Sequence, residues 1–341
     1  MQLITDLRTV RLERPTILTI GNFDGLHRGH QALLHIMAEL AAQAAAQQPD
    51  MPAPAIGLLT FDPHPLAVLR PDKPIQLLTL PQERIQFAAQ AGAELGIVQP
   101  FTPEIAGLRA AEFMQLLHTH LNLQMLAVGP DFALGKGRSG NIERLGELGA
   151  ELGYELHVIE PVDWNGKAAR SSHIRQLLQT GEVAEAAELL SRPYHVTGRV
   201  IEGDHRGSTI GIPTANLQTA PHKMLPQDGV YATRTYVPLS PTHSLNVGDF
   251  PAAKATSMLA AYHSVTNIGM RPTVNGREHR FETHLLDFPP DGASGNLYDE
   301  ILTVEFMARL RGEQKFAGID ELVGQIHRDI AMARQLFLVQ E

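Results

Sequence analysis

Up to about residue 190, short runs of apolar residues alternate with longer segments of helical periodicity. The apolar runs predict buried strands, and the segments between them predict amphipathic helices. Strands and helices in alternation predict an α/β domain with a parallel, doubly wound sheet and helices on both faces. The predicted strands are 15–21, 56–61, 94–101, 124–129 and 154–162, and helical patterns include 31–47, 110–121 and 142–152.

After Arg192-Pro193 the pattern changes to short β-rich pieces that are separated by turn residues. One helical segment, 319–339, closes the chain. This pattern predicts a small antiparallel β-barrel with a C-terminal helix. We therefore expect two domains, 1–186 and 187–341. The predicted barrel strands are 195–201, 229–237, 263–269, 280–288 and 302–310.

Length and composition agree with two globular domains. The chain has 341 residues, of which 43% are hydrophobic and 19% charged, enough to bury substantial cores. Its 28 Lys and Arg against 37 Asp and Glu give a net charge of −9. That balance argues against nucleic acid or an anionic membrane as the main partner. It does not argue against ATP, whose site needs only a local cluster of cations and amides.

Two further features of the sequence concern cysteine chemistry and the cellular location of the protein. There are no cysteines, which excludes disulfides, thiolate zinc sites and a cysteine nucleophile. The N-terminal residues do not resemble a signal peptide, and no apolar run approaches the roughly 20 residues of a membrane span. We expect a cytoplasmic protein.

The first candidate site is GNFDGLHRGH (21–30), which follows the first predicted strand. His27 and His30 share one face at the start of a helix, and Gly29 lets backbone approach a ligand. The junction of first strand and helix is the usual phosphate-binding corner of a doubly wound sheet. The alternative is two solvent-exposed histidines on a surface turn.

This corner suits adenylyl transfer. A phosphate nucleophile is already ionised at neutral pH, so the reaction needs no general base. It needs alignment with the α-phosphate and stabilisation of charge on the phosphoryl oxygens and the departing pyrophosphate. Histidines that donate hydrogen bonds, with nearby cations, meet those needs.

Two further segments fit nucleotide binding. In ARSSHIRQLL (169–178), Ser171 and Ser172 begin a predicted helix and Arg175 lies one turn in, so they could hold a triphosphate or simply cap the helix. GPDFALGKGRSGN (129–141) carries Lys136 and Arg138 in a loop after a strand. Its G-x-G-x-x-G match does not follow the strand directly, so we reject a dinucleotide fingerprint.

The second candidate site lies in the C-terminal half. If PTAN is extended, Thr214 and Asn216 point the same way and offer two oxygen donors, which suffice for Mg²⁺ beside ATP. Glu282 in the predicted strand FETHLLDF is a candidate general base, because an alcohol must lose a proton as it attacks. The alternatives are a local Pro-led turn for PTAN and a solvent-facing position for Glu282.

With these residues in place, the chain resembles the bacterial bifunctional riboflavin kinase/FAD synthetases almost from end to end. The resemblance implies a Rossmann-like nucleotidylyltransferase domain joined to a six-stranded riboflavin-kinase barrel. It implies riboflavin, FMN and ATP as substrates, Mg²⁺ in both halves, and FMN and FAD as products. The blocks that carry it are IGNFDGLHRGHQALL, TFDPHPLAVL, GPDFALGKGRSGN, SSHIRQLL, RPYHVTGRVIEGD, IGIPTANL, NIGMRPTV, ETHLLDF and MARLRGEQKFAGIDELVGQIHRD.

The resemblance also assigns roles to single residues. It implies catalytic roles for His27, His30 and Arg175 in adenylylation and for Glu282 in the kinase. It implies that Thr214 and Asn216 bind the metal and that Asp131, Phe132, Arg138 and Asn267 bind flavin. The implied ATP-binding residues are Gly21, Phe23, Gly29, Ser171, Ser172, Gly211, Pro213, Thr214 and Asn216.

The chain departs from the family pattern in places. His173 stands where threonine is usual, Ser208 where a basic residue is common, and Met270 where threonine is usual. The stretch 236–258 is longer and richer in Pro and Ser than the short hairpin expected. These departures affect fine nucleotide contacts, chiefly in the kinase.

Two other functions stay open at this point: another H-x-G-H mononucleotide adenylyltransferase, and a flavin-binding protein without turnover. The sequence also leaves open a weak homo-oligomer.

Overall fold

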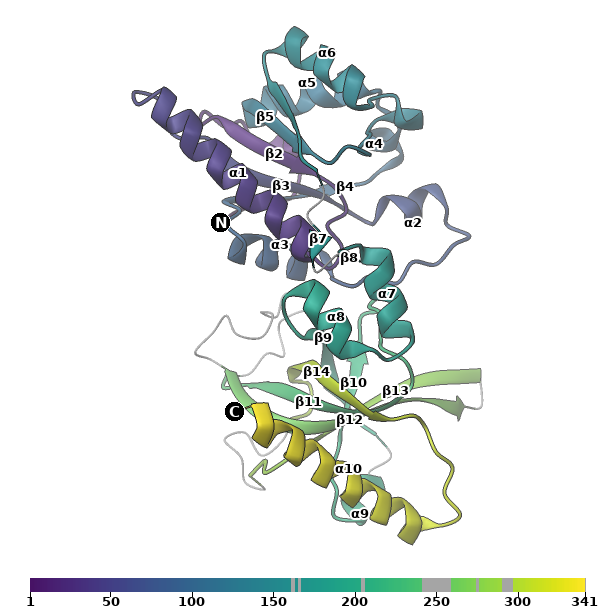
Figure 1. Ribbon diagram of the computed structural model, residues 1–341. Helices are drawn as coiled ribbons and strands as arrows, with labels where there is room; N and C mark the ends of the chain where they lie inside the picture. Colours follow the sequence, from purple (N-terminus) through teal and green to yellow (C-terminus); the bar gives the residue numbers. More distant parts are fainter. Residues whose placement is uncertain are drawn as a thin grey trace. The chain divides into compact units, whose positions relative to one another are not determined.

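In the computed structural model the chain forms two compact units, Met1–Arg170 and Ser171–Glu341 (Figure 1). The structure describes residues 1–160, 163–164, 167–203, 206–240, 259–273, 276–289 and 297–340. The division precedes helix α7 (Ser171–Gln179), whereas the predicted boundary at 186/187 falls inside α8 (Val183–Leu190). Both helices thus pack with the second unit, and the functional limits of the domains stay a prediction.

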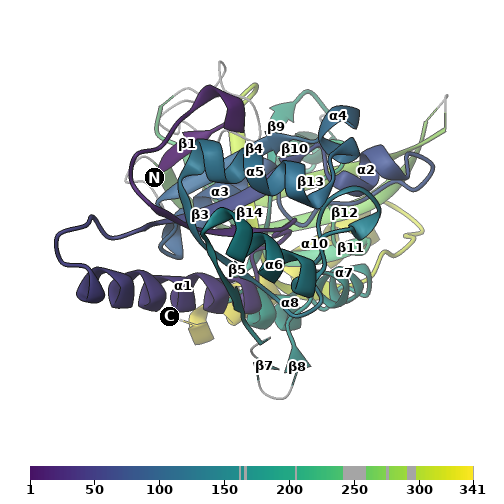
Figure 2. The same cartoon turned by 90° about the horizontal axis from the view of Figure 1, so that it is seen from above.

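The first unit is built on a six-stranded sheet in the order β1-β4-β3-β2-β5-β6. Every neighbouring pair is parallel, which confirms the predicted doubly wound, Rossmann-like sheet. The strands are β1 (Gln2–Ile4), β2 (Thr16–Ile20), β3 (Ala55–Asp62), β4 (Leu95–Pro100), β5 (Leu123–Val128) and β6 (Glu155–Val158). Two short strands, β7 (Asp163–Trp164) and β8 (Lys167–Ala168), form a separate antiparallel pair (Figure 2).

Helices cover both faces of this sheet. On one face, Leu18 and Leu59 pack against Phe113 and Leu117 in one apolar cluster. Residues one position along these strands point to the opposite face, which α1 and α3 cover (Figure 1). The helices are α1 (Arg28–Gln47), α2 (Pro65–Leu69), α3 (Pro81–Gln90), α4 (Pro103–Gly107), α5 (Ala110–Leu121) and α6 (Ile142–Leu152), with short 3-10 turns η1 (Leu7–Thr9) and η2 (Lys136–Arg138).

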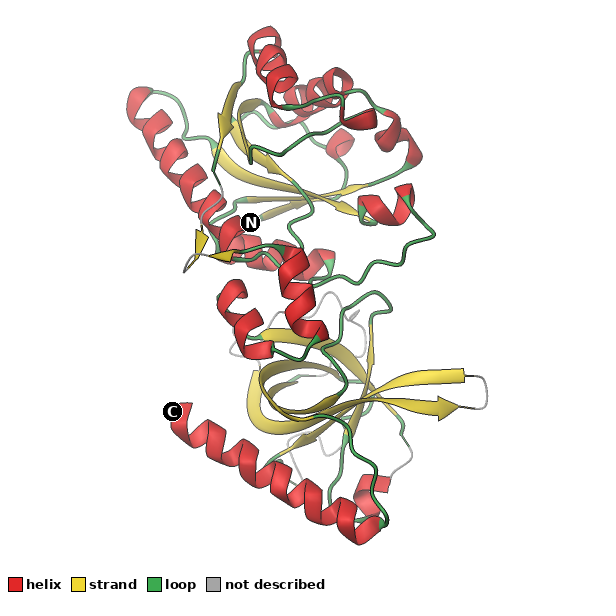
Figure 3. Ribbon diagram, turned by 45° about the vertical axis from the view of Figure 1, so that its right-hand side comes forward, coloured by secondary structure: helices red, strands yellow, loops and turns green. Residues whose placement is uncertain are grey.

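The second unit is a closed six-stranded barrel in the order β10-β13-β12-β11-β14-β9 (Figure 3). All of its pairs are antiparallel, which confirms the predicted barrel. The C-terminal helix packs along its outer face and contacts β11, β12 and β14. The elements are β9 (Tyr194–Ile201), α9 (Arg206–Thr209), β10 (Ala215–Thr219), β11 (Gly229–Pro238), β12 (Leu259–Thr273), β13 (Gly276–Leu285), β14 (Ile301–Arg311) and α10 (Ile319–Gln340).

The barrel interior contains hydroxyl groups that satisfy one another. Thr233 Oγ1 lies 2.8 Å from Ser264 Oγ and 2.7 Å from Thr266 Oγ1, which in turn donates to Thr283 Oγ1 at 3.0 Å. All four residues are fully buried. Because side chains alternate along a strand, the residues beside them face outward, toward α10. This alternation decides which side chains can form a site on the outside of the barrel.

Within the described parts of the chain, none of the helices combines the length and the apolar character that a bilayer crossing requires. The extended stretch 236–258 continues β11 to Pro238, and its residues 241–258 lie outside the described residues. The side chain of Ser208 lies outside them as well.

Candidate functional sites

The first site begins where β2 ends and the chain turns into α1. The loop between them contains three residues with positive φ, Phe23 (46°), Gly25 (87°) and Leu26 (37°). His27 then caps the helix, because its carbonyl accepts from the backbone N–H groups of His30 (2.8 Å) and Gln31 (3.0 Å). The tightly turned loop therefore sets the direction in which both histidines leave the sheet.

The two histidines lie together, as their spacing predicts. Their rings stack with centroids 3.7 Å apart and an angle of 19° between planes, and Phe23 meets His30 edge-on at 5.0 Å. His27 is only 6% exposed. This burial argues against two solvent-exposed histidines on a surface turn.

The surroundings of His30 favour its neutral form. Burial, then the charges of His27 and Arg84, hold the pKa of His30 well below its ordinary value of 6.5. Burial acts in this direction because removing water penalises the imidazolium more than the neutral ring. A neutral imidazole still donates one hydrogen bond, so His30 can bind a phosphoryl oxygen without gaining a proton.

Two of the predicted ATP-binding glycines pack tightly around this pair. A Cβ at Gly29 would lie 3.3 Å from two atoms of the His27 ring, and one at Gly21 would lie 3.2 Å from the Phe23 ring. Both positions thus leave little room for any side chain. The structure brings Gly21, Phe23, Gly29 and the histidines together.

The loop after β5 opens at the same edge of the sheet. β2 and β5 are parallel neighbours, so the loops that follow them emerge on one side, the usual ligand side of such sheets. Phe132 packs against the apolar cluster below, while Arg138 is exposed and donates to the carbonyl of Asp131 at 2.9 Å. The predicted flavin-binding residues of this half therefore lie in one loop.

Ser171, Ser172 and Arg175 occupy the first two turns of α7, in the second unit. Their part in the first site stays a prediction.

The second site is a pocket of about 480 Å³ on the outer face of the barrel, beside α10. Five of the residues predicted from the sequence line it: Pro213, Thr214, Asn216, Asn267 and Glu282. Gly211, with a φ of 75°, does not line the pocket and forms the turn before it. Met270, one of the departures from the family pattern, is 37% exposed and is not among the lining residues.

Strand register explains why these side chains meet. Asn216 of β10 pairs with Glu282 of β13, which pairs with Asn267 of β12. Asn267 pairs with Val230 of β11, and Val230 with Arg311 of β14. Directly opposite residues share one face of a sheet, so five strands present one row of side chains to the pocket. Thr214 and Asn216 line the same pocket, and their role as metal ligands stays a prediction.

Arginine and histidine side chains that sequence reasoning missed also line the pocket. Arg280 Nη1 lies 3.0 Å from Glu282 Oε1, and His284 Nδ1 donates to the carbonyl of Pro213 at 2.7 Å. Arg280 and His284 lie two residues on either side of Glu282 along β13. This period of two was the available signal, because it places all three on the same face.

The helix side of the pocket is held by a paired arginine and aspartate. Arg311 Nε lies 3.0 Å from Asp329 Oδ2 and Arg311 Nη2 lies 2.8 Å from the same oxygen, with Gln325 donating to Asp329 Oδ1 at 2.8 Å. Arg311 also lies over the Phe316 ring, 5.8 Å from its centroid. These contacts join β14, the following loop and α10 into one wall.

Two glycines leave space for polar side chains of the pocket region. A Cβ at Gly203 would lie 2.6 Å from Asn216 Cγ, and one at Gly269 would lie 3.1 Å from Glu313 Cδ. Both separations are well below ordinary van der Waals contact. Asn216 and Glu313 therefore reach their places only because these residues have no side chain.

A search of the described residues for three or more His, Cys, Asp or Glu side chains that could hold a metal ion found none. The candidate metal donors at the second site, Thr214 and Asn216, are neutral oxygens. Two such donors suit a cation whose other ligands are phosphate oxygens and water.

Comparison with known proteins matches both halves. A family model described as riboflavin kinase covers residues 190–337, and one described as FAD synthetase covers residues 10–173. Bifunctional riboflavin kinase/FMN adenylyltransferases match nearly the whole chain. The Escherichia coli K12 protein is 36% identical over 322 residues, covering 94% of this chain and 92% of its own. The Pseudomonas fluorescens protein is 34% identical, with 98% of each chain covered, and the Bacillus subtilis protein is 32% identical, covering 94% and 92%.

A solved structure described as a macrolide-efflux protein from Streptococcus pneumoniae also matches. Its TM-score is 0.80 at 27% identity, with 98% of each chain covered. That likeness supports the fold.

Proposed function

The chain belongs to the family of bifunctional riboflavin kinase/FMN adenylyltransferases, and from that premise we propose which residues carry each reaction. The chain phosphorylates riboflavin to FMN with ATP and adenylylates FMN to FAD. The kinase reaction belongs to the second unit and the adenylyl transfer to the first.

For the kinase, the observation that carries the proposal is the row formed by Asn216, Glu282 and Asn267 on three neighbouring strands. We assign Glu282 as the general base that accepts the proton of the riboflavin primary hydroxyl as its oxygen attacks the γ-phosphorus of ATP. The bond from that phosphorus to the bridging oxygen breaks, and ADP leaves. Asn267, next in the row, binds the flavin.

Thr214 and Asn216 are the residues that would hold Mg²⁺ beside the phosphates of ATP. When bound, the cation would neutralise charge that develops on the transferring phosphoryl group. Arg280, 3.0 Å from Glu282, is a second positive group at the same end of the pocket. With Pro213 and Thr214, this end supplies the polar contacts that a nucleotide needs.

Apolar side chains also line the pocket, and they suit the flat ring system of a flavin. Val230 and Val265 line it from the barrel, Phe316 from the loop, and Ile326 and Ile330 from α10. Apolar walls with a few placed polar groups are typical of small-molecule sites. The assignment orients riboflavin with its ring beside α10 and its ribityl hydroxyl at Glu282.

For adenylyl transfer, His27 and His30 donate hydrogen bonds to phosphoryl oxygens of ATP. A phosphate oxygen of FMN attacks the α-phosphorus, and the bond to the pyrophosphate oxygen breaks. No base is required, in agreement with the lowered pKa of His30, which keeps that ring neutral. The role of the pair is to place and stabilise charge in the transition state.

Around that pair we assign further contacts from the sequence. Gly21, Phe23 and Gly29 would bind ATP, together with Ser171 and Ser172. Arg175 would stabilise the departing pyrophosphate. In the loop after β5, the flavin-binding residues would be Asp131, Phe132 and Arg138. The cytoplasmic location and a weak homo-oligomer stay predictions of the sequence.

One assay tests the assignment against a flavin-binding protein without turnover. The purified chain is incubated with riboflavin, ATP and Mg²⁺, and flavins are separated by chromatography. FMN and then FAD are expected, and neither forms when Mg²⁺ is replaced by a chelator. A binder without turnover returns only riboflavin. An H-x-G-H adenylyltransferase without the kinase returns FAD only when FMN is supplied.

A further inference from the structure

We propose that Arg84 is a positioning residue for FMN adenylylation, because it holds the loop 22–26 that sets His27 and His30 at the start of α1. The proposal deepens the function assigned above to the histidine pair and rests on it. Arg84 comes from α3, far along the chain from the histidines. It belongs to no motif that the sequence singled out.

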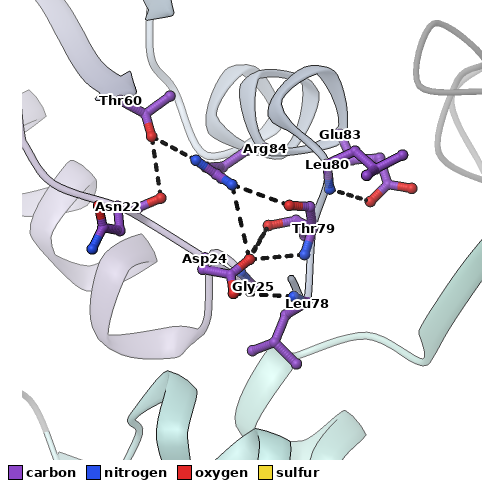
Figure 4. A network of polar contacts seen from close by, with 9 residues as sticks. All are labelled: Asn22, Asp24, Gly25, Thr60, Leu78, Thr79, Leu80, Glu83 and Arg84. Carbon is purple, nitrogen blue, oxygen red and sulfur yellow. Dashed lines mark hydrogen bonds and ion pairs between the residues drawn. The ribbon is translucent and has the colours of Figure 1, made fainter. Parts of the chain in front are cut away.

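Arg84 is a fully buried arginine that hydrogen-bonds at both ends of its guanidinium (Figure 4). It is 1% exposed, and its Nη1 donates to Thr60 Oγ1 at 2.7 Å while its Nη2 donates to the carbonyl of Thr79 at 3.1 Å. Asp24 Oδ1 lies 4.0 Å from Nη2. Charged side chains are buried this deeply only when they are paired and hydrogen-bonded.

From Arg84 one connection reaches the first residue of the loop. Thr60 Oγ1 accepts from Arg84 and donates to the carbonyl of Asn22 at 3.1 Å. The hydroxyl thus relays the position of the guanidinium to the backbone just after β2. Thr60 itself is fully buried in β3, so it has a fixed place in the sheet.

A second connection reaches the middle of the loop through Asp24. Its carboxylate accepts from the backbone N–H groups of Leu78 (3.0 Å) and Thr79 (2.9 Å) and from Thr79 Oγ1 (3.0 Å). The same Thr79 hydroxyl accepts from the backbone N–H of Gly25 at 2.8 Å. Asp24, 2% exposed, is therefore held by the segment whose Thr79 carbonyl accepts from Arg84.

These contacts explain how the loop keeps an unfavourable backbone. Phe23 and Leu26 have positive φ, a conformation that residues other than glycine adopt only where the surroundings impose it. Leu26 immediately precedes the helix cap His27, so any relaxation of the loop rotates both imidazoles. Held at Asn22, Asp24 and Gly25, the loop has no freedom to relax.

The charge of Arg84 has a second effect, on His30. Among the described residues, the charged groups that lower the pKa of that ring are His27, stacked on it, and Arg84, whose own partner is the Asp24 carboxylate. After burial and His27, Arg84 is the third cause that lowers the pKa of His30. Removing the positive charge raises that pKa, while a lysine in its place keeps it low. This titration therefore reports the charge of Arg84 separately from its hydrogen-bond geometry.

The test uses the full chain with Thr60→Val, Arg84→Met and Arg84→Lys. For Thr60→Val we expect kcat for FAD formation to fall about tenfold, with KM for ATP and FMN changed less than about twofold, because alignment rather than binding is lost. Riboflavin phosphorylation, in the other unit, should stay at the wild-type rate. Thr16→Val is the matched control, since Thr16 is equally buried and hydrogen-bonds at the opposite end of β2.

The arginine variants separate charge from geometry. Arg84→Met should lose about a hundredfold in kcat for FAD formation, and the NMR titration of His30 should move to higher pH. Arg84→Lys should restore the titration and recover only part of the rate, because it lacks the paired donors. If Arg84→Met fails to fold, the rates of FAD formation in Thr60→Val and Arg84→Lys test the proposal.

Wild-type FAD synthesis in folded Thr60→Val and Arg84→Lys would overturn the proposal, as would an equal loss of both activities. An unchanged His30 titration in folded Arg84→Met would overturn it too. If the wild-type chain made no FAD, the assigned function itself would fail, which is a distinct outcome.

Discussion

Replacing Gly203 with alanine tests the geometry of the kinase site most directly. The added Cβ would lie 2.6 Å from Asn216 Cγ, and the amide nitrogen of Asn216 lies closer still. Ordinary contact begins at 3.4 Å, so Asn216 Cγ must move by at least 0.8 Å, the difference between the two distances, and the amide nitrogen must move farther. Gly203 has no positive φ, so alanine does not strain the backbone itself.

The expected cost falls on activity rather than on stability. The clash is with the end of a side chain, which can turn aside at a cost of about 1 kcal/mol or less. Asn216 then leaves the row it forms with Glu282 and no longer reaches the metal and the phosphates. A misplacement of about 1 Å lowers kcat/KM by roughly a hundredfold. The melting temperature should change little.

The assay measures riboflavin phosphorylation and FAD formation from supplied FMN in one preparation. Gly203→Ala should lose the first about a hundredfold and keep the second. Gly318→Ala is the control, because nothing lies within 4 Å of a Cβ there and the site is in the same unit. Wild-type kinase activity in Gly203→Ala would show that the position of Asn216 does not matter, and would refute the assignment.

Four further outcomes are expected. Glu282→Gln keeps the shape and removes the proton acceptor, so riboflavin phosphorylation should fall at least about a hundredfold; a full rate would place the base elsewhere. His27→Ala or His30→Ala should lower FAD formation by about a hundredfold or more and spare the kinase, whereas equal loss of both activities would refute separate sites. Because the pKa of His30 is lowered in the folded chain, below pH about 6.5 the unfolded chain binds a proton that the folded chain does not. As pH decreases below that value, the stability of the first unit should therefore decrease by up to about 1.4 kcal/mol per pH unit. In His30→Gln, the melting temperature should depend less on pH. Asp329→Ala leaves a largely buried arginine unpaired and should destabilise the second unit by about 3 kcal/mol in denaturant; Asp287→Ala, at an exposed pair, should cost much less, and equal losses would contradict the reasoning.

Secondary structure could be predicted where the pattern is local. Helices α5 and α6 begin and end at the predicted residues, because their apolar stripes are regular and α6 has a cap at each end, Asn141 and Gly153. Strand β1 was not predicted, since three residues show no period and β1 forms only by pairing with β4. Helix α3 was missed as well, and its buried Glu83 and Arg84 blur the apolar stripe.

The kinase site was predictable in part. Motifs identified Asn216 and Glu282, and alternation along β13 could have added Arg280 and His284. What brings the two motifs together is the pairing of Asn216 with Glu282, and strand register across a closed barrel depends on all six strands at once. No local pattern contains that information.

Arg84 shows why a supporting residue is harder to find than a catalytic one. An arginine next to a glutamate in a helix predicts two solvent-exposed side chains. Arginine is almost never fully buried unless it is paired, and the sequence does not show a buried partner. Two of its partners, Thr60 and Asp24, come from other segments of the chain and have no fixed spacing relative to it. Two histidines that act on one ligand must share one face of a helix. Their spacing along the chain is therefore short and can be recognised as a motif. A residue that acts through them needs only to reach the same loop, from whichever element the fold places beneath it.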